Sequence, residues 1–286
     1  MVYLRSVEMD PNQKPLKNDL TTAEAFAKSW MHLPAGSVYS FEQFEEWLSP
    51  ITREEVEEKT VLELGCGNGS LLVHLTKWRP SRIVAVELGP SAEVAEKNMA
   101  ETDYRSYSIV RADLTTFSSD GFDLVYCIGV LHHLANPDKG FDSVLKNVKP
   151  AGRFHCWVYA REGNAAILHV VDPLRKITSR LPWQITKYLV ATPLAAVYFI
   201  YAKLLRRLSR FRLIRKAPLF EYSVWIALRP FAFFRHVAFD QLVSPRTGYI
   251  DRQTVEKWLS DPRVLPDSSY IVFRNGNSWK FGGRVR

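Results

Sequence analysis

The sequence predicts an α/β protein with a doubly wound, seven-stranded, mostly parallel sheet, an antiparallel closing hairpin and a helical insertion. Between residues 60 and 159, five short apolar runs alternate with amphipathic stretches. Four of these runs are apolar almost throughout, as strands covered on both faces are. This alternation stops at residue 160, and a helix and two strand-like runs follow from residue 251. The interruption indicates an insertion in one continuous sheet domain.

The first part of the sheet is expected to contain five strands and the helices between them. Pro137 suits the first turn of the third helix, where its missing N–H costs nothing. Strands that alternate with helices predict parallel pairing and a doubly wound order. The strands are expected at 60–65, 82–89, 107–114, 122–129 and 153–159, and the helices at 70–78, 91–100 and 137–149.

The last part of the chain is expected to complete the sheet. Residues 251–260 form a helical pattern that begins at Asp251, a residue type that caps helix N-termini. Two strand-like runs follow, at 269–276 and 278–286, and Asn275 and Gly276 lie where they join. An Asn-Gly pair favours a tight hairpin, so these runs are expected to form antiparallel strands.

Three regions follow from this pattern. Residues 1–59 form an N-terminal helical cap, with helices at 22–33 and 41–51. Residues 60–159 and 251–286 form the sheet domain, and residues 160–250 form a helical insertion that is both basic and apolar.

The net charge of +8 comes from the insertion. Residues 160–250 hold 15 Lys and Arg against 4 Asp and Glu, a balance of +11, and the rest of the chain has 38 − 15 = 23 bases against 30 − 4 = 26 acids. A field so localised predicts an anionic partner, such as lipid headgroups, a nucleic acid or an acidic substrate. A solvated helix surface would give the same composition.

Residues 188–216 pair an apolar run with a basic one. Residues 188–202 are uncharged and contain Pro193, and 15 residues fall short of the roughly 20 that span a bilayer. Residues 203–216 carry seven bases among leucines and a phenylalanine, a pattern that predicts a helix with an apolar face and an arginine face. Such a helix could lie on an anionic membrane, or pack its apolar face on the sheet domain.

The cysteines give no evidence of a metal site or a disulfide framework. Cys66, Cys127 and Cys156 are three in number and far apart, and each lies in an apolar run. The N-terminal residues also show no secretory signal pattern. A reducing cytoplasm is therefore the expected location, at the inner face of a membrane if the insertion binds lipid.

The stretch VLELGCGNGS, residues 61–70, carries the main functional signal. A predicted strand gives way to glycines at 65, 67 and 69, which let the backbone turn sharply and let a ligand lie against its amides. A dinucleotide loop would read G-x-G-x-x-G, but Ser70 stands at the third glycine position and the chain reads E-x-G-x-G-x-G.

This loop and the residues after it resemble the class I S-adenosylmethionine-dependent methyltransferases of small-molecule type. Glu87 ends the second strand, where the family has an acid that binds the ribose hydroxyls. Asp113 ends the third, where an Asp and the next amide hold the adenine. The motif GVLHH at 129–133 and the pair Ala151-Gly152 follow in the family's order.

The resemblance covers residues 58–159 and the closing strands from 251. It implies S-adenosylmethionine as the cofactor, S-adenosylhomocysteine as a product, and no metal. The implied cofactor-binding residues are Glu63, Gly65, Cys66, Gly67, Gly69, Glu87, Leu88, Asp113, Leu114, Cys127 and Ile128.

Methyl transfer mainly needs positioning, because the sulfonium is already activated. A hydroxyl or acidic carbon acceptor also needs a general base, for which His132 and His133 are candidates. Adjacent side chains point apart, so at most one should reach the acceptor. The chain lacks the Asp/Asn-Pro-Pro-aromatic loop of base N-methylation, a cysteine beside proline, and acidic metal ligands after the fourth strand.

The acceptor is expected to be a small or lipid-like molecule bound by the added segments. Two alternatives remain open: an RNA methyltransferase that uses the basic insertion, and a cofactor-binding module without turnover. The uninterrupted apolar run in the insertion argues against nucleic acid. Candidate substrate-contacting residues are Trp30, Tyr39, Tyr159 and Arg161, with Phe26 and Glu162 as further wall residues.

Overall fold

The computed structural model describes residues 16–30 and 39–286, with the side chains of Ser29 and Trp30 left out. Seven strands form one sheet in the order β3-β2-β1-β4-β5-β7-β6. The chain moves outward from β1 to β3 and then returns to β4 beside β1, so a crevice opens at the strands' carboxyl ends. The strands are β1 (Thr60–Leu64), β2 (Arg82–Glu87), β3 (Tyr107–Arg111), β4 (Phe122–Ile128), β5 (Val148–Tyr159), β6 (Tyr270–Arg274) and β7 (Ser278–Arg284).

This sheet confirms the predicted fold class. The pairs β1–β2, β2–β3, β1–β4 and β4–β5 are parallel, whereas β7 pairs antiparallel with both β5 and β6. The hairpin turns at Asn275 and Gly276, whose φ angles of 51° and 64° are the left-handed values that this dipeptide tolerates. β5 begins five residues before its predicted start.

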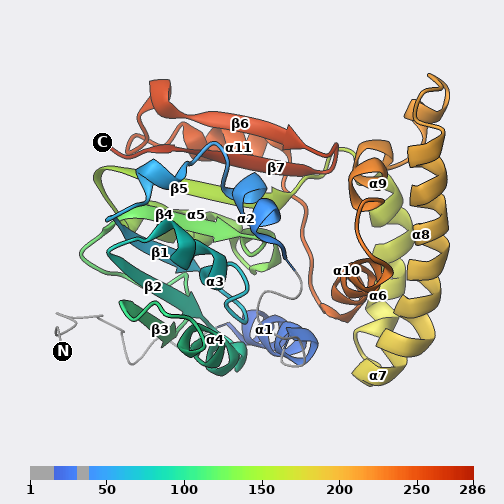
Figure 1. Cartoon of the computed structure of the whole chain (residues 1–286), viewed down its shortest axis with the longest axis horizontal. Coiled ribbons are helices and arrows are strands. Elements are labelled where there is room, and N and C mark those ends of the chain that lie inside the picture. The colour runs from blue at the N-terminus through green and yellow to red at the C-terminus, as the bar shows by residue number, and fades with distance from the viewer. Residues whose placement is uncertain (1–15, 31–38) are drawn as a thin grey trace.

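Helices cover both faces of the sheet (Figure 1). On one face, α5 and α11 bury an aromatic cluster in which Phe141 stacks on Trp258 with ring centroids 5.1 Å apart. On the other face, α2, α3 and α4 bury Phe44 and Met99. The helices are α1 (Lys17–Trp30), α2 (Phe41–Leu48), α3 (Leu72–Leu75), α4 (Ser91–Ala100), α5 (Pro137–Lys146), α6 (Asp172–Thr178), α7 (Trp183–Ile185), α8 (Thr192–Arg207), α9 (Phe220–Ile226), α10 (Phe231–Val243) and α11 (Arg252–Leu259).

Several helix ends follow from local chemistry. Asp251 caps α11, because its carboxylate accepts a 2.8 Å hydrogen bond from the amide of Thr254. Ser40 and Gln43 form a reciprocal capping box at the start of α2. Asn136 caps α5, and Pro137 occupies its first turn as expected.

The insertion, α6 to α10, stands at the carboxyl edge of the sheet as a separate helical layer (Figure 1). α8 packs along α9 and α10, and α1 reaches across to contact both α10 and α4. The crevice of the sheet is therefore enclosed by helices from both ends of the sequence.

The apolar segment of the insertion is longer than its uncharged run indicates. Trp183–Arg207 is one continuous helix of 25 residues, long and apolar enough by length and composition to cross a membrane, so the prediction that it is too short was wrong. A π-helical turn at Thr186–Ala191 precedes Pro193. The wider turn relieves the clash of the proline ring with the preceding backbone, and the Thr192 hydroxyl donates to the Lys187 carbonyl.

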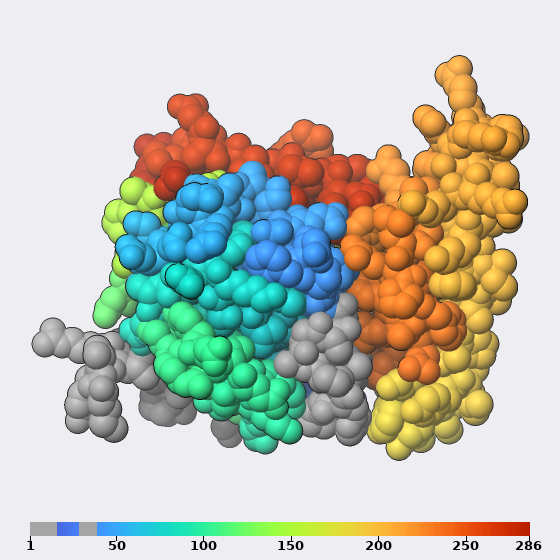
Figure 2. Space-filling view, in the orientation of Figure 1, coloured from blue at the N-terminus to red at the C-terminus, as the bar shows by residue number. Residues whose placement is uncertain are grey.

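The predicted helix over 203–216 is wrong in its second half. α8 ends at Arg207, and the chain continues through turns to a short 3₁₀ segment at Ile214–Lys216. Arg206, Arg207 and Arg210 would stack within one helical turn of each other, and like charges at this spacing oppose helix formation. In Figure 2 the end of α8 and the residues after it project beyond the rest of the molecule.

Candidate active site

A cavity of about 620 Å³ lies at the carboxyl ends of the central strands, between the sheet, α1 and the insertion. Its volume is in the range of small-molecule sites. One part is lined by the glycine loop and the ends of β2 and β3, and another by the end of β4, β5 and α10. The two parts are continuous, so a cofactor and an acceptor could meet in this cavity.

The glycine loop needs backbone conformations that side chains disfavour. Gly65, Gly67 and Gly69 have φ angles of 81°, 55° and 76°. A β-carbon on Gly67 would meet no atom within 4 Å, whereas one on Gly69 would lie 3.2 Å from the Cα of Ala95 in α4. Gly67 therefore leaves room for a ligand, and Gly69 lets helix α4 pack closely.

Glu87 fixes this loop to the end of β2. One carboxylate oxygen accepts a 2.9 Å hydrogen bond from the amide of Gly67, and the other accepts a 2.8 Å bond from the amide of Gly89. Burial raises the pKa of Glu87, and these amide hydrogen bonds act in the opposite direction. The Ser91 hydroxyl and the Leu88 amide also act to lower the pKa of this carboxyl. Glu87 lines the cavity, and a carboxylate only accepts hydrogen bonds, so it can take them from ligand hydroxyls.

Asp113 and Leu114 line the cavity beyond Glu87, after β3. Oδ1 of Asp113 accepts 2.8 Å hydrogen bonds from the amide and the hydroxyl of Thr115, which fix the carboxylate at the turn. Asp19 of α1 lies on the same part of the wall and accepts a 2.7 Å hydrogen bond from the amide of Ala135. Burial raises the pKa of Asp19.

Glu63 lies in the floor of the cavity, at the end of β1. Burial raises its pKa to about 8, although Oε2 accepts a 2.8 Å hydrogen bond from the Tyr126 hydroxyl. Glu63 is therefore mostly protonated at neutral pH.

Nine of the eleven predicted cofactor-binding residues line the cavity, and two do not. The side chain of Cys127 points into the core of the opposite face, so the expectation that it contacts the cofactor is corrected. Side chains alternate along a strand, and its neighbour Ile128 takes the cavity side. Gly69 lies behind the loop, where it packs on α4.

The two candidate histidines have different environments. His133 lines the cavity, and its Nδ1 lies 3.0 Å from the Arg246 carbonyl, to which it must donate. Burial lowers the pKa of His133 to about 4, so its ring is neutral at pH 7. His132 is buried outside the cavity wall, and its Nδ1 accepts from the amide of Tyr159 at 3.4 Å. Only His133 could contact an acceptor.

The predicted substrate residues also divide. Phe26, Tyr39 and Tyr159 line the cavity. Arg161 is exposed and does not, which corrects that expectation. Glu162 instead joins two segments, because it accepts hydrogen bonds from the Arg252 amide and the Trp279 indole. The Trp30 side chain lies outside the described residues.

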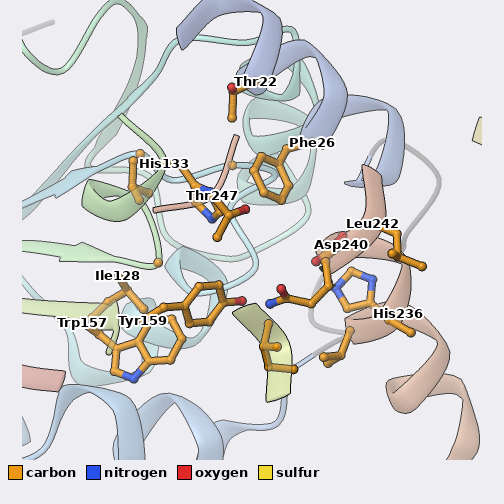
Figure 3. A pocket seen from close by; sticks show the side chains of 18 of the residues that line it. Thr22, Phe26, Ile128, His133, Trp157, Tyr159, His236, Asp240, Leu242 and Thr247 are labelled. Carbon is orange, nitrogen blue, oxygen red and sulfur yellow. Dashed lines mark ion pairs between the residues drawn. The ribbon is translucent and has the colours of Figure 1, made fainter. Parts of the chain in front are cut away.

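The sequence analysis missed the wall that faces the sheet. His236, Asp240 and Gln241 of α10 line the cavity, and Thr247 and Tyr249 follow from the segment after α10. Figure 3 shows Ile128, His133 and Tyr159 on the sheet side, with His236 and Asp240 on the opposite side. The one signal in the sequence is that His236 and Asp240 lie four residues apart in a mostly apolar helix.

A buried arginine supports this wall from behind. Arg175 of α6 pairs with Asp172 and donates to Oε1 of Gln241 at 2.8 Å and to the backbone carbonyl of Gln241 at 2.6 Å. The Gln241 side chain lies near the Tyr159 hydroxyl and acts to lower its pKa. The hydrogen bonds of Arg175 join α6 to α10, so this wall of the cavity is held in place.

Comparison with known proteins agrees with this geometry. A family model described as a methyltransferase domain matches residues 62–154, which include the glycine loop, Glu87, Asp113 and the end of β4. The chain contains a class I methyltransferase domain. The cofactor of this domain is S-adenosylmethionine, and the open space at Gly67, the acceptor oxygens of Glu87 and the carboxylate of Asp113 fit it. Among the described residues, no group of three or more His, Cys, Asp or Glu side chains could hold a metal ion.

The chain is similar to proteins that carry different names, and it covers different shares of their lengths. An uncharacterized protein of Synechococcus sp. is 30% identical over 119 residues, 40% of this chain and 28% of that protein. A ubiquinone biosynthesis O-methyltransferase of Coxiella burnetii is 24% identical over 172 residues, 57% of this chain and 71% of that enzyme. The N-methyltransferase NodS from Bradyrhizobium japonicum is a structural neighbour with a TM-score of 0.49 and 13% identity, covering 92% of this chain and 98% of that one.

Gly67 and Gly69 of the glycine loop should respond differently to substitution by alanine. Gly67→Ala should cost about 1–2 kcal/mol of stability, the price of a left-handed alanine, and should weaken S-adenosylmethionine binding tenfold or more. Gly69→Ala should cost a further ~1–3 kcal/mol, because its β-carbon meets the backbone of α4. Urea unfolding and calorimetric titration measure the two effects. Equal stability losses with unchanged cofactor affinity would contradict these roles.

Protonated Glu63 should make the stability of the cofactor-free protein depend on pH. Its pKa is about 8 in the folded protein and about 4.3 when unfolded, so the folded state holds a proton that the unfolded state releases. Stability should fall by up to ~1.4 kcal/mol per pH unit between about pH 5 and pH 8, then level off. Glu63→Gln, which keeps an acceptor for Tyr126, should remove this component. If the free energy of unfolding changed with pH to the same extent in the wild type and in Glu63→Gln, the assignment would be refuted.

Proposed function

We propose that the protein transfers a methyl group from S-adenosylmethionine to a small, lipid-like acceptor in the cytoplasm, at the surface of an anionic membrane. The observation that carries the first part is the continuous cavity, which joins the cofactor-binding loop to an apolar chamber in the insertion. The bound cofactor supplies an activated methyl group, and the chain supplies position and exclusion of water.

The chamber favours an apolar acceptor. Beyond Tyr159 its walls are built mainly from aliphatic and aromatic side chains of the π-helical segment Ile167–Val171, α8, α9 and α10. Burying apolar surface there would provide most of the binding energy. The named relatives in ubiquinone biosynthesis support a ring compound with an apolar tail, an inference that we extend from those enzymes to this chain.

The outer face of α8 favours a membrane surface. Leu189, Val197, Ile200 and Leu204 are 71%, 69%, 68% and 52% exposed, and their spacing places them along one side of the helix. Six exposed bases follow in the projecting segment, namely Arg206, Arg207, Arg210, Arg212, Arg215 and Lys216. An apolar stripe beside a basic cluster suits the interface of an anionic bilayer. The cluster alone would also suit RNA phosphates, but the stripe would not.

Removal of the Glu87 carboxylate should abolish cofactor binding. Glu87→Ala loses two charged hydrogen bonds and loosens the glycine loop, so affinity for S-adenosylmethionine should fall 100-fold or more. Glu87→Gln should give a smaller loss, and Glu93→Ala, an exposed glutamate on α4, should bind as the wild type does. Calorimetry measures all four proteins. Absence of binding by the wild type would refute the proposed activity, and binding without transfer to prenylated phenols or amines would favour a cofactor-binding module.

Membrane binding should need both parts of the surface. Two double variants test this: one replaces apolar side chains, Ile200→Ser with Leu213→Ser, and the other replaces bases, Arg210→Gln with Arg212→Gln. Each should reduce severalfold the amount of protein that floats with phosphatidylcholine vesicles containing phosphatidylglycerol. Neither pair lines the cavity, so cofactor binding should be unchanged. Val272→Ser on strand β6 is the matched control for an exposed apolar side chain. Equal flotation of all variants would exclude the membrane surface, and arginine-dependent binding of an RNA oligonucleotide instead would assign it to nucleic acid.

A further inference from the structure

We propose that the His236–Asp240 pair of α10 accepts the proton of a hydroxyl acceptor, so that the methyl group is transferred to oxygen. This inference rests on the proposed methyl transfer and names the chemistry of its acceptor. It assigns a task to two residues that lie outside the methyltransferase domain match, in the insertion.

The pair is built into the cavity wall. Nε2 of His236 lies 3.1 Å from Oδ2 of Asp240, and the two side chains are only 9% and 16% exposed. Both line the cavity, opposite Tyr159 and His133, which come from the end of β5 and the segment after β4 (Figure 3). A surface pair at this helical spacing would be well hydrated, whereas this pair faces a mostly apolar chamber.

The charge of the reaction favours such a pair. A neutral hydroxyl that receives a methyl cation becomes positively charged unless it loses its proton, which is costly in an apolar cavity. A pair made of a neutral imidazole and a carboxylate carries a charge of −1. The pair becomes neutral overall when its imidazole takes up the proton. The positive charge of the cofactor's sulfonium is lost in the same event, so the summed charge of the sulfonium and the pair is zero before and after transfer.

The bond changes balance without another reactant. The acceptor oxygen forms a bond to the methyl carbon as the carbon–sulfur bond breaks and its electron pair stays on sulfur. The hydroxyl proton passes to the His236–Asp240 pair and is later released to water. The products are a methyl ether, S-adenosylhomocysteine and one proton.

Tyr159 can position the oxygen between the cofactor and the pair. Oε1 of Gln241 accepts from Arg175, so the Gln241 amide nitrogen is the group that can donate toward the Tyr159 hydroxyl oxygen, whose pKa Gln241 acts to lower. The hydroxyl proton of Tyr159 then remains available to the acceptor oxygen. Burial raises the pKa of Tyr159 far above neutral, so it keeps that proton at physiological pH.

His133 is a weaker candidate for the base. Its Nδ1 is bound to the Arg246 carbonyl, and a pKa of about 4 gives its remaining nitrogen little affinity for a proton.

Asp240 lies close enough to Tyr39, Tyr159, His133 and Lys187 to shift the pKa of each. The two tyrosines stay neutral to high pH, His133 is neutral above pH 5, and burial lowers the pKa of Lys187 from its usual 10.5.

Turnover with two matched acceptors tests the proposal. A prenylated phenol needs the base, whereas the corresponding prenylated aniline attacks through its nitrogen lone pair and does not need prior deprotonation. Asp240→Asn and His236→Asn should lower kcat for the phenol about 100-fold or more, with a small effect on KM and a few-fold effect on the aniline. His169→Asn, an exposed histidine of the insertion outside the cavity wall, is the control.

A spectroscopic titration tests the same step without turnover. 4-Nitrophenol, whose phenolate absorbs visible light, is titrated into each protein saturated with S-adenosylhomocysteine. The bound phenol should be more ionised in the wild type than in Asp240→Asn. Calorimetric binding of S-adenosylhomocysteine by every variant establishes that the cavity is intact.

The outcomes separate the two proposals. If the wild type binds no S-adenosylmethionine, the proposed function fails. If it binds, and the variants keep both phenol turnover and the ionisation of bound 4-nitrophenol, only the role of His236 and Asp240 is overturned. Selective loss of phenol turnover in His133→Asn with normal Asp240→Asn would assign the base to His133 instead.

Discussion

The hydrogen bonds from two backbone amides to Glu87 are the constraint on which the cofactor site depends. They join the loop after β1 to the loop after β2. The carboxylate is buried, a costly position that those amides partly offset. These hydrogen bonds hold the loop in left-handed conformations, and the glycines leave the side of the loop that faces the cavity free of β-carbons. The strand order then sets where this loop opens, because β1 lies beside β4, where the chain switches from adding strands on one side of β1 to adding them on the other.

The insertion completes a site that the sheet leaves open. The sheet side supplies Ile128, His133 and Tyr159 on one wall, and the chain returns after α10 to place Thr247 and Tyr249 over the same opening. This return segment is tied to the end of β4, because the amide of Gly248 donates to the carbonyl of His132. The acceptor chamber is therefore attached to the strand ends by the backbone, and its depth is set by how α10 packs on α6 and α8.

The sequence predicted those parts of the fold in which local chemistry decides the structure. The parallel strands, the Asn275–Gly276 hairpin and the Asp251 cap all follow from short-range patterns that the structure confirms. Cys127 shows where pattern matching went too far, since its side chain and that of Ile128 point to opposite faces of the sheet. α10 was not predictable in the same way, because it packs apolar residues on α8 and also lines the cavity, so no single face is polar.

The position of the cavity mouth connects the two halves of the proposed function. Val170, Leu194 and Val197 line the cavity and are also 65%, 42% and 69% exposed. Two of them lie on α8, the helix that carries the exposed apolar stripe. If that stripe rests on a bilayer, the opening faces lipid, and an apolar acceptor can move from the membrane to Tyr159 without exposing its tail to water. A polar or highly charged acceptor would gain nothing from this route, because it would have to leave water at the apolar rim.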